Sequence, residues 1–267
     1  MTRALLTLSI GPVHGFIAQA RRVADQWAAS TLLSRLVGTG IETVWAHDGE
    51  MVFPYVARDQ KIPPGLPNRF VCEVDRGRVE EIARAVEGAI RGEWGRLVVR
   101  AADLWETIGP QIDPRIWSRG PGVHQTDVFL DLAWSWVPLE PDYPTAMKRG
   151  AELYAASRRY RPFAQKEELG EKCPLCGERT ALPNGKRERV RTDWEGVLKR
   201  AEELGQGLAA YLRHDQGRLC LVCFTKRIYP YLERQSREEV TFGASQDDAL
   251  RNMAERIGSS IVSTAAS

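Results

Sequence analysis

Sulfur is scarce in this sequence of 267 residues, which contains only five cysteines and four methionines. No segment approaches the roughly 20 consecutive apolar residues that span a membrane. The N-terminal apolar run is short, is interrupted by Gly11-Pro12 and lacks the cleavage site of a signal peptide. These absences predict a cytoplasmic protein without membrane contact, where thiols stay reduced. Cysteines in such a compartment favour a metal site or thiol chemistry over disulfides.

A strong net charge is also missing. The sequence has 37 Lys and Arg residues against 35 Asp and Glu residues, which leaves a formal charge of +2. No global field therefore indicates nucleic acid, and any such contact has to come from a local basic patch. The hydrophobic fraction of 43% is ordinary for a globular protein. The length allows one large or two small domains with a core of their own.

Four of the five cysteines form two CxxC pairs, Cys173-Pro-Leu-Cys176 and Cys220-Leu-Val-Cys223. Zinc takes four ligands in a tetrahedron, and thiolates suit it well. Residues 177–219 separate the pairs, a long insert that is tolerated because loop-closure entropy grows only logarithmically. With sulfur in all four positions no site stays open for a substrate, so we expect a structural zinc ion. An iron–sulfur cluster or a redox pair are the alternatives, and no thioredoxin-like context or further cysteine supports them.

The fifth cysteine, Cys72, shares the apolar face of a predicted strand with Phe70 and Val74. A cysteine in that setting behaves as a small buried hydrophobic residue. We therefore expect Cys72 in the core rather than in a site.

Hydrophobic periodicity indicates the fold. Strands are predicted at residues 4–10, 41–47, 51–57, 69–75 and 126–137, and helices at 14–37 and 79–107. Gly38 and Gly40 are expected to end the first helix, and Asp48-Gly49 to form the turn of a hairpin. The order of strand, helix, two strands, helix and strand predicts an α+β fold, a ferredoxin-like palm (βαββαβ), followed by a helical zinc-binding module.

Three domains are expected along the chain. Residues 1–140 form the palm-like domain, and residues 141–230 form the helical four-cysteine module, with helices at 146–160 and 194–214. Residues 231–267 begin a further helical domain, with a short helix that a capping box opens at Ser245 and Asp248 and that Gly258 closes.

The most distinctive stretch of the sequence is residues 8–34, LSIGPVHGFIAQARRVADQWAASTLLS. It resembles the first strand and helix of the large palm-domain subunit of type III-B (Cmr-type) CRISPR effector complexes, with His14 in place of the usual Gln and Gln26 in place of a Leu. Arg161-Pro-Phe163 before the first CxxC pair, Lys226-Arg227 after the second and the segment Val262–Ala266 resemble further landmarks of that family. The resemblance thus extends from one end of the chain to the other.

In that family, two palms bind ATP between them, and the second palm carries a GGDD motif that joins ATP into cyclic oligoadenylates. An HD nuclease domain often precedes the first palm. This sequence contains neither the GGDD motif nor an HD domain, and Gly11-Pro12 stands where a catalytic palm has a metal-binding carboxylate. The resemblance therefore implies a truncated or split portion that is not catalytic alone. We expect ATP and a divalent metal only together with the second palm of the same subunit.

The resemblance also implies which residues face the nucleotide, namely Gly11, His14, Ser30 and Ser34. The loop at Gly11 and His14 joins a strand to a helix N-terminus, where phosphate can bind. The alternative for Ser30 and Ser34 is that each hydroxyl bonds back to a carbonyl one helical turn earlier.

Basic residues flank the cysteine module. They are either solvated or in contact with RNA or a neighbouring subunit. These residues are Arg158, Arg159, Arg161, Lys186, Arg187, Arg189 and Arg191.

Three functions follow from these observations. The first is a scaffold of a type III-B effector complex that supplies half of an ATP site, with other CRISPR effector subunits, CRISPR RNA and target RNA as partners. The second is a stand-alone zinc-containing RNA-binding module. The third is a structural assembly subunit with no nucleotide role.

Overall fold

The computed structural model describes residues 2–112, 116–117, 125–159, 168, 170–182, 187–205, 207–213 and 219–241, with the backbone alone at 187–192 and 237–241. The chain divides into two compact units, and each is assembled from three separate stretches. The first unit comprises Met1–Ala18, Ala29–Trp94 and Leu130–Lys166, and the second comprises Gln19–Ala28, Gly95–Phe129 and Glu167–Ser267. The domain boundaries expected at residues 140 and 230 stay predictions.

The first unit is built on an antiparallel sheet of four strands in the order β2-β3-β1-β4. The strands are β1 (Arg3–Gly11), β2 (Glu50–Phe53), β3 (Arg69–Asp75) and β4 (Asp131–Pro138). β1 lies in the middle, where Leu6 is opposite Cys72 of β3 and Trp136 of β4. Residues 4–11 of β1 are all buried, including the polar Thr7 and Ser9, so both faces of this strand are covered, as in a central strand.

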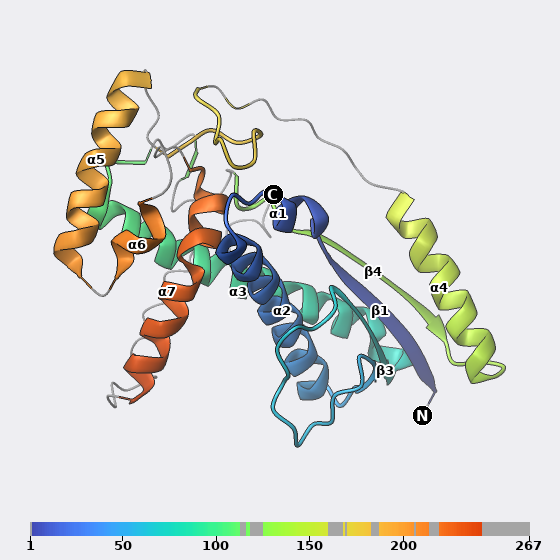
Figure 1. Ribbon diagram of the computed structural model, residues 1–267. Helices are drawn as coiled ribbons and strands as arrows, with labels where there is room; N and C mark the ends of the chain where they lie inside the picture. The colour runs from blue at the N-terminus through green and yellow to red at the C-terminus, as the bar shows by residue number, and fades with distance from the viewer. Residues whose placement is uncertain are drawn as a thin grey trace, which may run out of the picture. The chain divides into compact units, whose positions relative to one another are not determined.

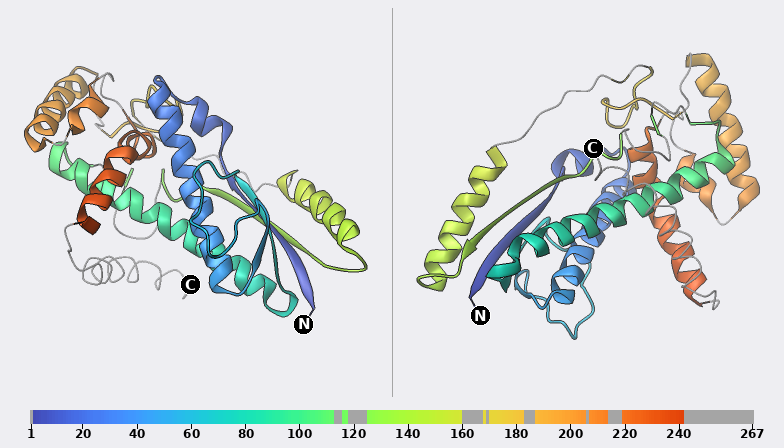
Figure 2. Two further views of the ribbon diagram at one scale, coloured as in Figure 1. Left: turned by 60° about the horizontal axis from the view of Figure 1, so that its bottom comes forward. Right: turned by 180° about the vertical axis from the view of Figure 1, so that it is seen from behind.

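Helices cover both faces of this sheet (Figures 1 and 2). On one face, Phe70 of β3 lies against residues of α2 (Val23–Ala46) and α3 (Val79–Ile108), because Gly40 and Ile90 meet there. On the other face, α4 (Tyr143–Arg159) buries Ala146 in an apolar cluster with Leu5, Val71 and Val137. The sheet is therefore the middle layer of the first unit.

The first predicted helix is wrong in its limits. Instead of one helix over 14–37, the structure has a short α1 (His14–Ala18) and then α2, which runs through Gly38 and Gly40 to Ala46. A side chain at Gly40 would place its Cβ 3.0 Å from Ile90 and 3.2 Å from Phe70. The two glycines thus allow close packing of α2 rather than ending it.

The predicted hairpin at Asp48-Gly49 is also wrong. Residues 41–46 belong to α2 rather than to a strand, and Asp48, with a φ of 58°, lies in the left-handed conformation that ends a helix. Gly49 N–H donates to the carbonyl of Val44 at 2.9 Å in the same turn. Of the strand predicted at 51–57, only β2 over 50–53 forms, and it pairs with β3.

The remaining elements agree more closely with the sequence. Strand 69–75 is confirmed, and α3 ends one residue beyond the predicted helix, at Ile108. The strand predicted at 126–137 is shorter, because residues 125–129 form turns before β4. The helix predicted at 194–214 is two helices, α5 (Arg187–Leu204) and α6 (Leu208–Leu212), separated at Gly205 and Gly207, which both have positive φ.

Two further elements complete the described chain, the 3-10 helix η1 (Arg76–Arg78) and α7 (Leu221–Thr241). The short helix predicted between Ser245 and Gly258 lies outside the described residues. None of the helices in the described part of the chain combines the length and apolar character needed to cross a membrane.

The second unit has an aromatic core. Trp105 of α3 is fully buried between Trp194 of α5, at a ring-centroid distance of 6.0 Å, and Phe224 of α7, at 5.2 Å. Arg200 of α5 donates from Nε to the last carbonyl of α3, at Ile108. These contacts hold the C-terminal part of α3, α5 and α7 together.

A buried ion pair joins the start of α2 to α7 in the same unit. Arg227 donates from Nε and Nη2 to the two carboxylate oxygens of Asp25, and each side chain is 1% exposed. Arg22 lies 3.5 Å from the same carboxylate, and the backbone N–H of Arg21 also donates to it. Such a pair resists the removal of one partner, since the other charge is then buried without compensation.

We expect the substitution Asp25→Asn to destabilise the chain by about 3 kcal/mol, because it leaves the Arg227 guanidinium buried beside a neutral amide. Urea unfolding followed by tryptophan fluorescence measures the change. The control is Glu81→Gln, which breaks the exposed pair with Arg78 and should leave the unfolding midpoint unchanged. A midpoint for Asp25→Asn equal to that of the control contradicts the importance of the buried pair.

Candidate metal centre

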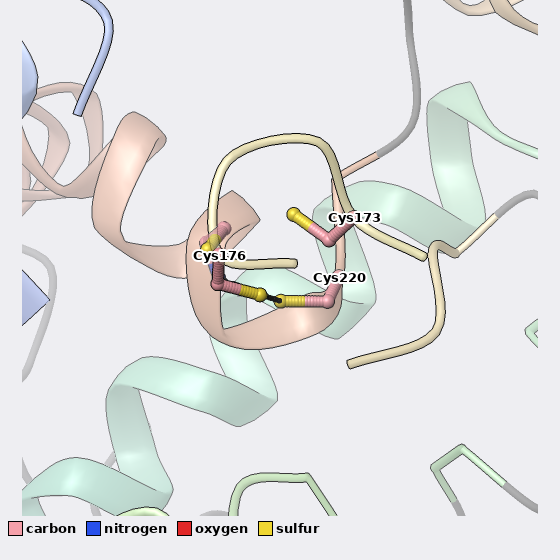
Figure 3. A group of neighbouring side chains, drawn as sticks. Cys173, Cys176 and Cys220 are labelled. Carbon is pink, nitrogen blue, oxygen red and sulfur yellow. Dashed lines mark hydrogen bonds between the residues drawn. The ribbon is translucent and has the colours of Figure 1, made fainter. Parts of the chain in front are cut away.

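The four cysteines of the two CxxC pairs meet in the second unit. Figure 3 shows three of them, Cys173, Cys176 and Cys220. Their sulfur atoms all lie within 4.8 Å of one another, and those of Cys176 and Cys220 are 3.8 Å apart. A zinc–sulfur bond of about 2.3 Å places the sulfurs of a regular tetrahedron about 3.8 Å apart. None of the four forms a disulfide. The cluster can therefore hold one metal ion, and its spacing is compatible with zinc.

The first pair lies in a tight turn. The N–H of Gly177 donates to the carbonyl of Cys173 at 2.7 Å, and Gly177 has a φ of 69° that other residues rarely adopt. The N–H of Cys173 donates to the carbonyl of Arg179, and a bridge joins Lys172 to Thr180. This small closed loop holds the sulfur atoms of Cys173 and Cys176 within 4.8 Å of each other.

The second pair lies at the N-terminus of α7. Cys220 precedes the helix, and its sulfur accepts from the N–H of Cys223 at 3.4 Å, as a capping side chain does. The positive end of the helix dipole favours thiolate at this position. The second pair is therefore prepared for a metal by the helix that carries it.

Gln125 connects the two pairs, and the sequence analysis missed it. Its side chain is 2% exposed, donates to the carbonyl of Thr180 at 2.7 Å and to Glu168, and accepts from the N–H of Leu221 at 3.0 Å. The side-chain amide of Gln125 therefore joins the segment of the first CxxC pair, at Thr180, to Leu221, the first residue of α7. No signal in the sequence marks it, because Gln125 is far along the chain from both pairs.

The thiols of the cluster differ in acidity from Cys72. Hydrogen bonds from Cys173 and from the other two cysteines hold the pKa of Cys176 far below its ordinary value, while burial raises the pKa of Cys220. Metal binding needs all four cysteines as thiolates and therefore releases the thiol protons that remain. Burial raises the pKa of Cys72 to about 12, and its side chain is fully buried in β3. Its predicted role as a small core residue is confirmed.

Comparison with known proteins shows which family this chain is similar to. A sequence model described as "CRISPR-associated protein Cmr2, N-terminal" matches residues 5–99. The CRISPR system Cmr subunit Cmr2 of Pyrococcus furiosus is 23% identical over 306 aligned positions, which cover 92% of this chain. Residues 5–99 are thus similar to the N-terminal region of Cmr2 proteins. The resemblance to the large subunit of type III-B complexes is thereby confirmed, and the chain spans about a third of the length of that relative.

Solved structures with the same fold agree with the Cmr2 match. A chain in a cryo-EM structure of the type III-B Cmr-beta in its apo state superimposes with a TM-score of 0.54 at 14% identity, over 85% of this chain and 31% of that one. A chain of the type III-B Cmr-beta bound to cognate target RNA gives 0.50 at 14% identity, over 85% of this chain and 32% of that one. At this identity, the likeness concerns the fold.

The residues expected to face a nucleotide all lie in the first unit of this chain. Gly11 is buried at the end of β1, and His14 is exposed at the start of α1, which has only five residues. Ser30 is exposed, whereas Ser34, one turn later on α2, is 5% exposed and accepts from the N–H of Leu66 at 2.9 Å. The hydroxyl of Ser34 therefore bonds a distant loop. The nucleotide role of all four residues stays a prediction.

The predicted basic surface is only partly described. Arg159 is exposed at the end of α4, and Arg158 lies 3.9 Å from the carboxylate of Asp131. Arg161 and Lys186 lie outside the described residues. The backbone at Arg187, Arg189 and Arg191 forms the first turns of α5. Contact with RNA or a partner stays a prediction for all seven residues.

Thiol labelling separates the cluster from Cys72. With zinc bound, we expect slow alkylation at all five cysteines. After zinc removal by a chelator, Cys173, Cys176, Cys220 and Cys223 become reactive, and Cys72 reacts only in denaturant because its thiol is buried and protonated. Mass spectrometry of iodoacetamide-treated protein counts the modified sites. Modification of Cys72 together with the other four, without denaturant, contradicts this separation.

Proposed function

We propose that this chain is the N-terminal portion of the large subunit of a type III-B CRISPR effector complex, where it acts as a scaffold. The observation that carries the proposal is the Cmr2 match, which includes the relative over 92% of this chain as well as the family model over residues 5–99. The related chains solved as parts of Cmr-beta, one with target RNA, support the same assignment. The expected partners are the other effector subunits, CRISPR RNA and target RNA in the cytoplasm.

The first unit is proposed to be the first, ferredoxin-like palm of that subunit. Two strand–helix–strand units that interleave give an antiparallel sheet in which the first and third strands lie side by side in the middle. The order β2-β3-β1-β4, with α2 after β1 and α3 after β3, supports this topology. A carboxylate pair for metal binding is missing at the end of β1, where Gly11-Pro12 stands. In this proposal the palm supplies half of a nucleotide site and the second palm supplies the chemistry.

The four-cysteine cluster is proposed to bind a structural zinc ion. Four sulfur ligands fill the tetrahedral coordination of zinc, so no position is left for a substrate. Zinc has no redox chemistry and serves here to join the turn at Cys173 to the start of α7. The zinc ion therefore supports the fold that carries the RNA and protein contacts rather than the reaction.

The nucleotide contacts are proposed for the backbone at Gly11 and the side chains of His14 and Ser30, both of which are exposed. Ser34 is proposed to act indirectly, because its hydroxyl accepts from the N–H of Leu66 and so positions that loop. α1 is short, so its dipole adds little, and the contacts depend on the side chains themselves.

The test uses the complete large subunit assembled with its partner subunits and RNA. The double variant His14→Ala/Ser30→Ala should bind ATP about tenfold more weakly, which corresponds to about 1.4 kcal/mol. Thr39→Ala, elsewhere on α2, is the matched control and should bind as the unchanged protein does. Equilibrium dialysis with labelled ATP measures the affinity, and mass photometry shows that assembly is intact.

Two results contradict parts of the proposal. Unchanged ATP affinity in the double variant removes the nucleotide half-site and leaves the assembly role. Failure of the complete subunit to co-purify with the other effector subunits and guide RNA removes the effector assignment itself. Strong, salt-dependent RNA binding by the 267-residue chain alone then favours the stand-alone RNA-binding function.

A further inference from the structure

Two basic side chains lie next to the four cysteines in the second unit. Lys226 follows Cys223 by three residues on α7, so both side chains share one face of the helix. Arg179 follows Cys176 by three residues, and its carbonyl accepts the N–H of Cys173 at 2.8 Å. Lys226 is 0% exposed, and the side chain of Arg179 is 16% exposed. Both charges are therefore held close to the cluster and away from water.

The burial of Lys226 requires a source of negative charge. A buried ammonium group is costly unless a partner balances it. Its Nζ donates to the main-chain carbonyl of Gln19, which is a neutral acceptor. Burial lowers the pKa of Lys226, and the negative charges of Cys223, Asp25 and Cys220 oppose that shift. Of these charges, that of Cys223 opposes the shift most strongly, so the cluster is the main source of the charge that balances Lys226.

Arg179 faces the cluster from the other pair. Burial by itself would lower the pKa of Arg179, but the negative charges of Cys220, Cys176 and Glu178 raise it overall. The guanidinium group also lies over the ring of Phe129, at 5.5 Å from its centroid. The aromatic ring and Glu178, 3.2 Å away, keep the guanidinium group in place beside the sulfurs.

The charge of a filled site explains why two cations are needed. Four thiolates around one divalent ion carry a net charge of about −2, which is unfavourable inside a protein unless it is compensated. Lys226 and Arg179 together supply two positive charges. Arg227 is next to Lys226 in sequence and is also buried, but its charge is balanced by Asp25 and is not available to the cluster. Charged groups outside the ligand shell commonly set the affinity of a metal site.

We infer that Lys226 and Arg179 are the counter-charges of a divalent metal tetrathiolate, and that Lys226 determines how tightly the cluster holds the ion. Lys226 is a positioning residue, not a ligand: its ammonium group donates to the carbonyl of Gln19, and its charge acts on the cluster without a bond to the metal. This inference rests on the proposed zinc site. It adds a residue whose charge, rather than its size, controls that site.

The experiment measures the zinc affinity of the 267-residue chain by competition with a chromophoric chelator. Lys226→Met keeps the length of the side chain without its charge and should weaken zinc binding about 10- to 100-fold. Lys226→Arg restores the charge and should recover most of the affinity. Lys199→Met, the same substitution on the exposed face of α5, should change nothing. Ile228→Ala, an uncharged change at a buried position of α7, should lower thermal stability but not the affinity of the folded protein.

Titration with cobalt(II) separates an effect on metal affinity from a loss of the ligand geometry. At saturation, the sulfur-to-cobalt absorption band of Lys226→Met should have the intensity expected for four thiolate ligands. A higher cobalt concentration should be needed to saturate the site. Zinc affinity that is unchanged in Lys226→Met, or that falls as far in Lys226→Arg, overturns the role of Lys226 and leaves the zinc site intact. If the unaltered chain binds neither zinc nor cobalt through four sulfurs, both the zinc site and this inference are wrong.

Discussion

The second unit depends on the meeting of four sulfur atoms. Its parts come from residues 19–28, 95–129 and 167–267, which are far apart along the chain. The Cys173 turn and the start of α7 converge at the cluster, and Gln125 and Lys226 attach the other two stretches to them through hydrogen bonds to Thr180, Leu221 and Gln19. A metal bond is much stronger than any one of these contacts. With the proposed zinc ion bound, the metal–sulfur bonds would contribute to the folding of the second unit.

The first unit obeys a different constraint, which is the packing of two long helices on a sheet. Local sequence patterns predicted this region incorrectly, because glycines often end helices and Asp-Gly often forms the turn of a hairpin. Gly40 instead lies where α2 packs against Phe70 and Ile90, and the helix ends at Ala46, nine residues later than expected, with Asp48 in the left-handed conformation after it. Close packing between elements outweighed local propensity, and no pattern within the segment reveals it. Where the pattern was long and regular, as in β1, β3 and α3, the prediction was sound.

The same contrast holds for the metal centre. The four cysteines were evident from their spacing, because each CxxC pair is a local motif with a chemical reason. Gln125 was not evident, because its three hydrogen bonds join segments that only the fold brings together. Lys226 was noted only as part of a family landmark, and its burial next to Cys223 gives it a physical role. Ser34 likewise has a partner, Leu66, that its place on a helix stripe does not indicate.

The central claim is that one zinc ion, held by sulfur alone, organises the second unit. X-ray absorption at the zinc edge of the purified chain tests it most directly, together with metal analysis of the same sample. The account predicts about one zinc ion per chain with four sulfur neighbours at about 2.3 Å. A first shell that contains nitrogen or oxygen, or an iron signal in place of zinc, contradicts it.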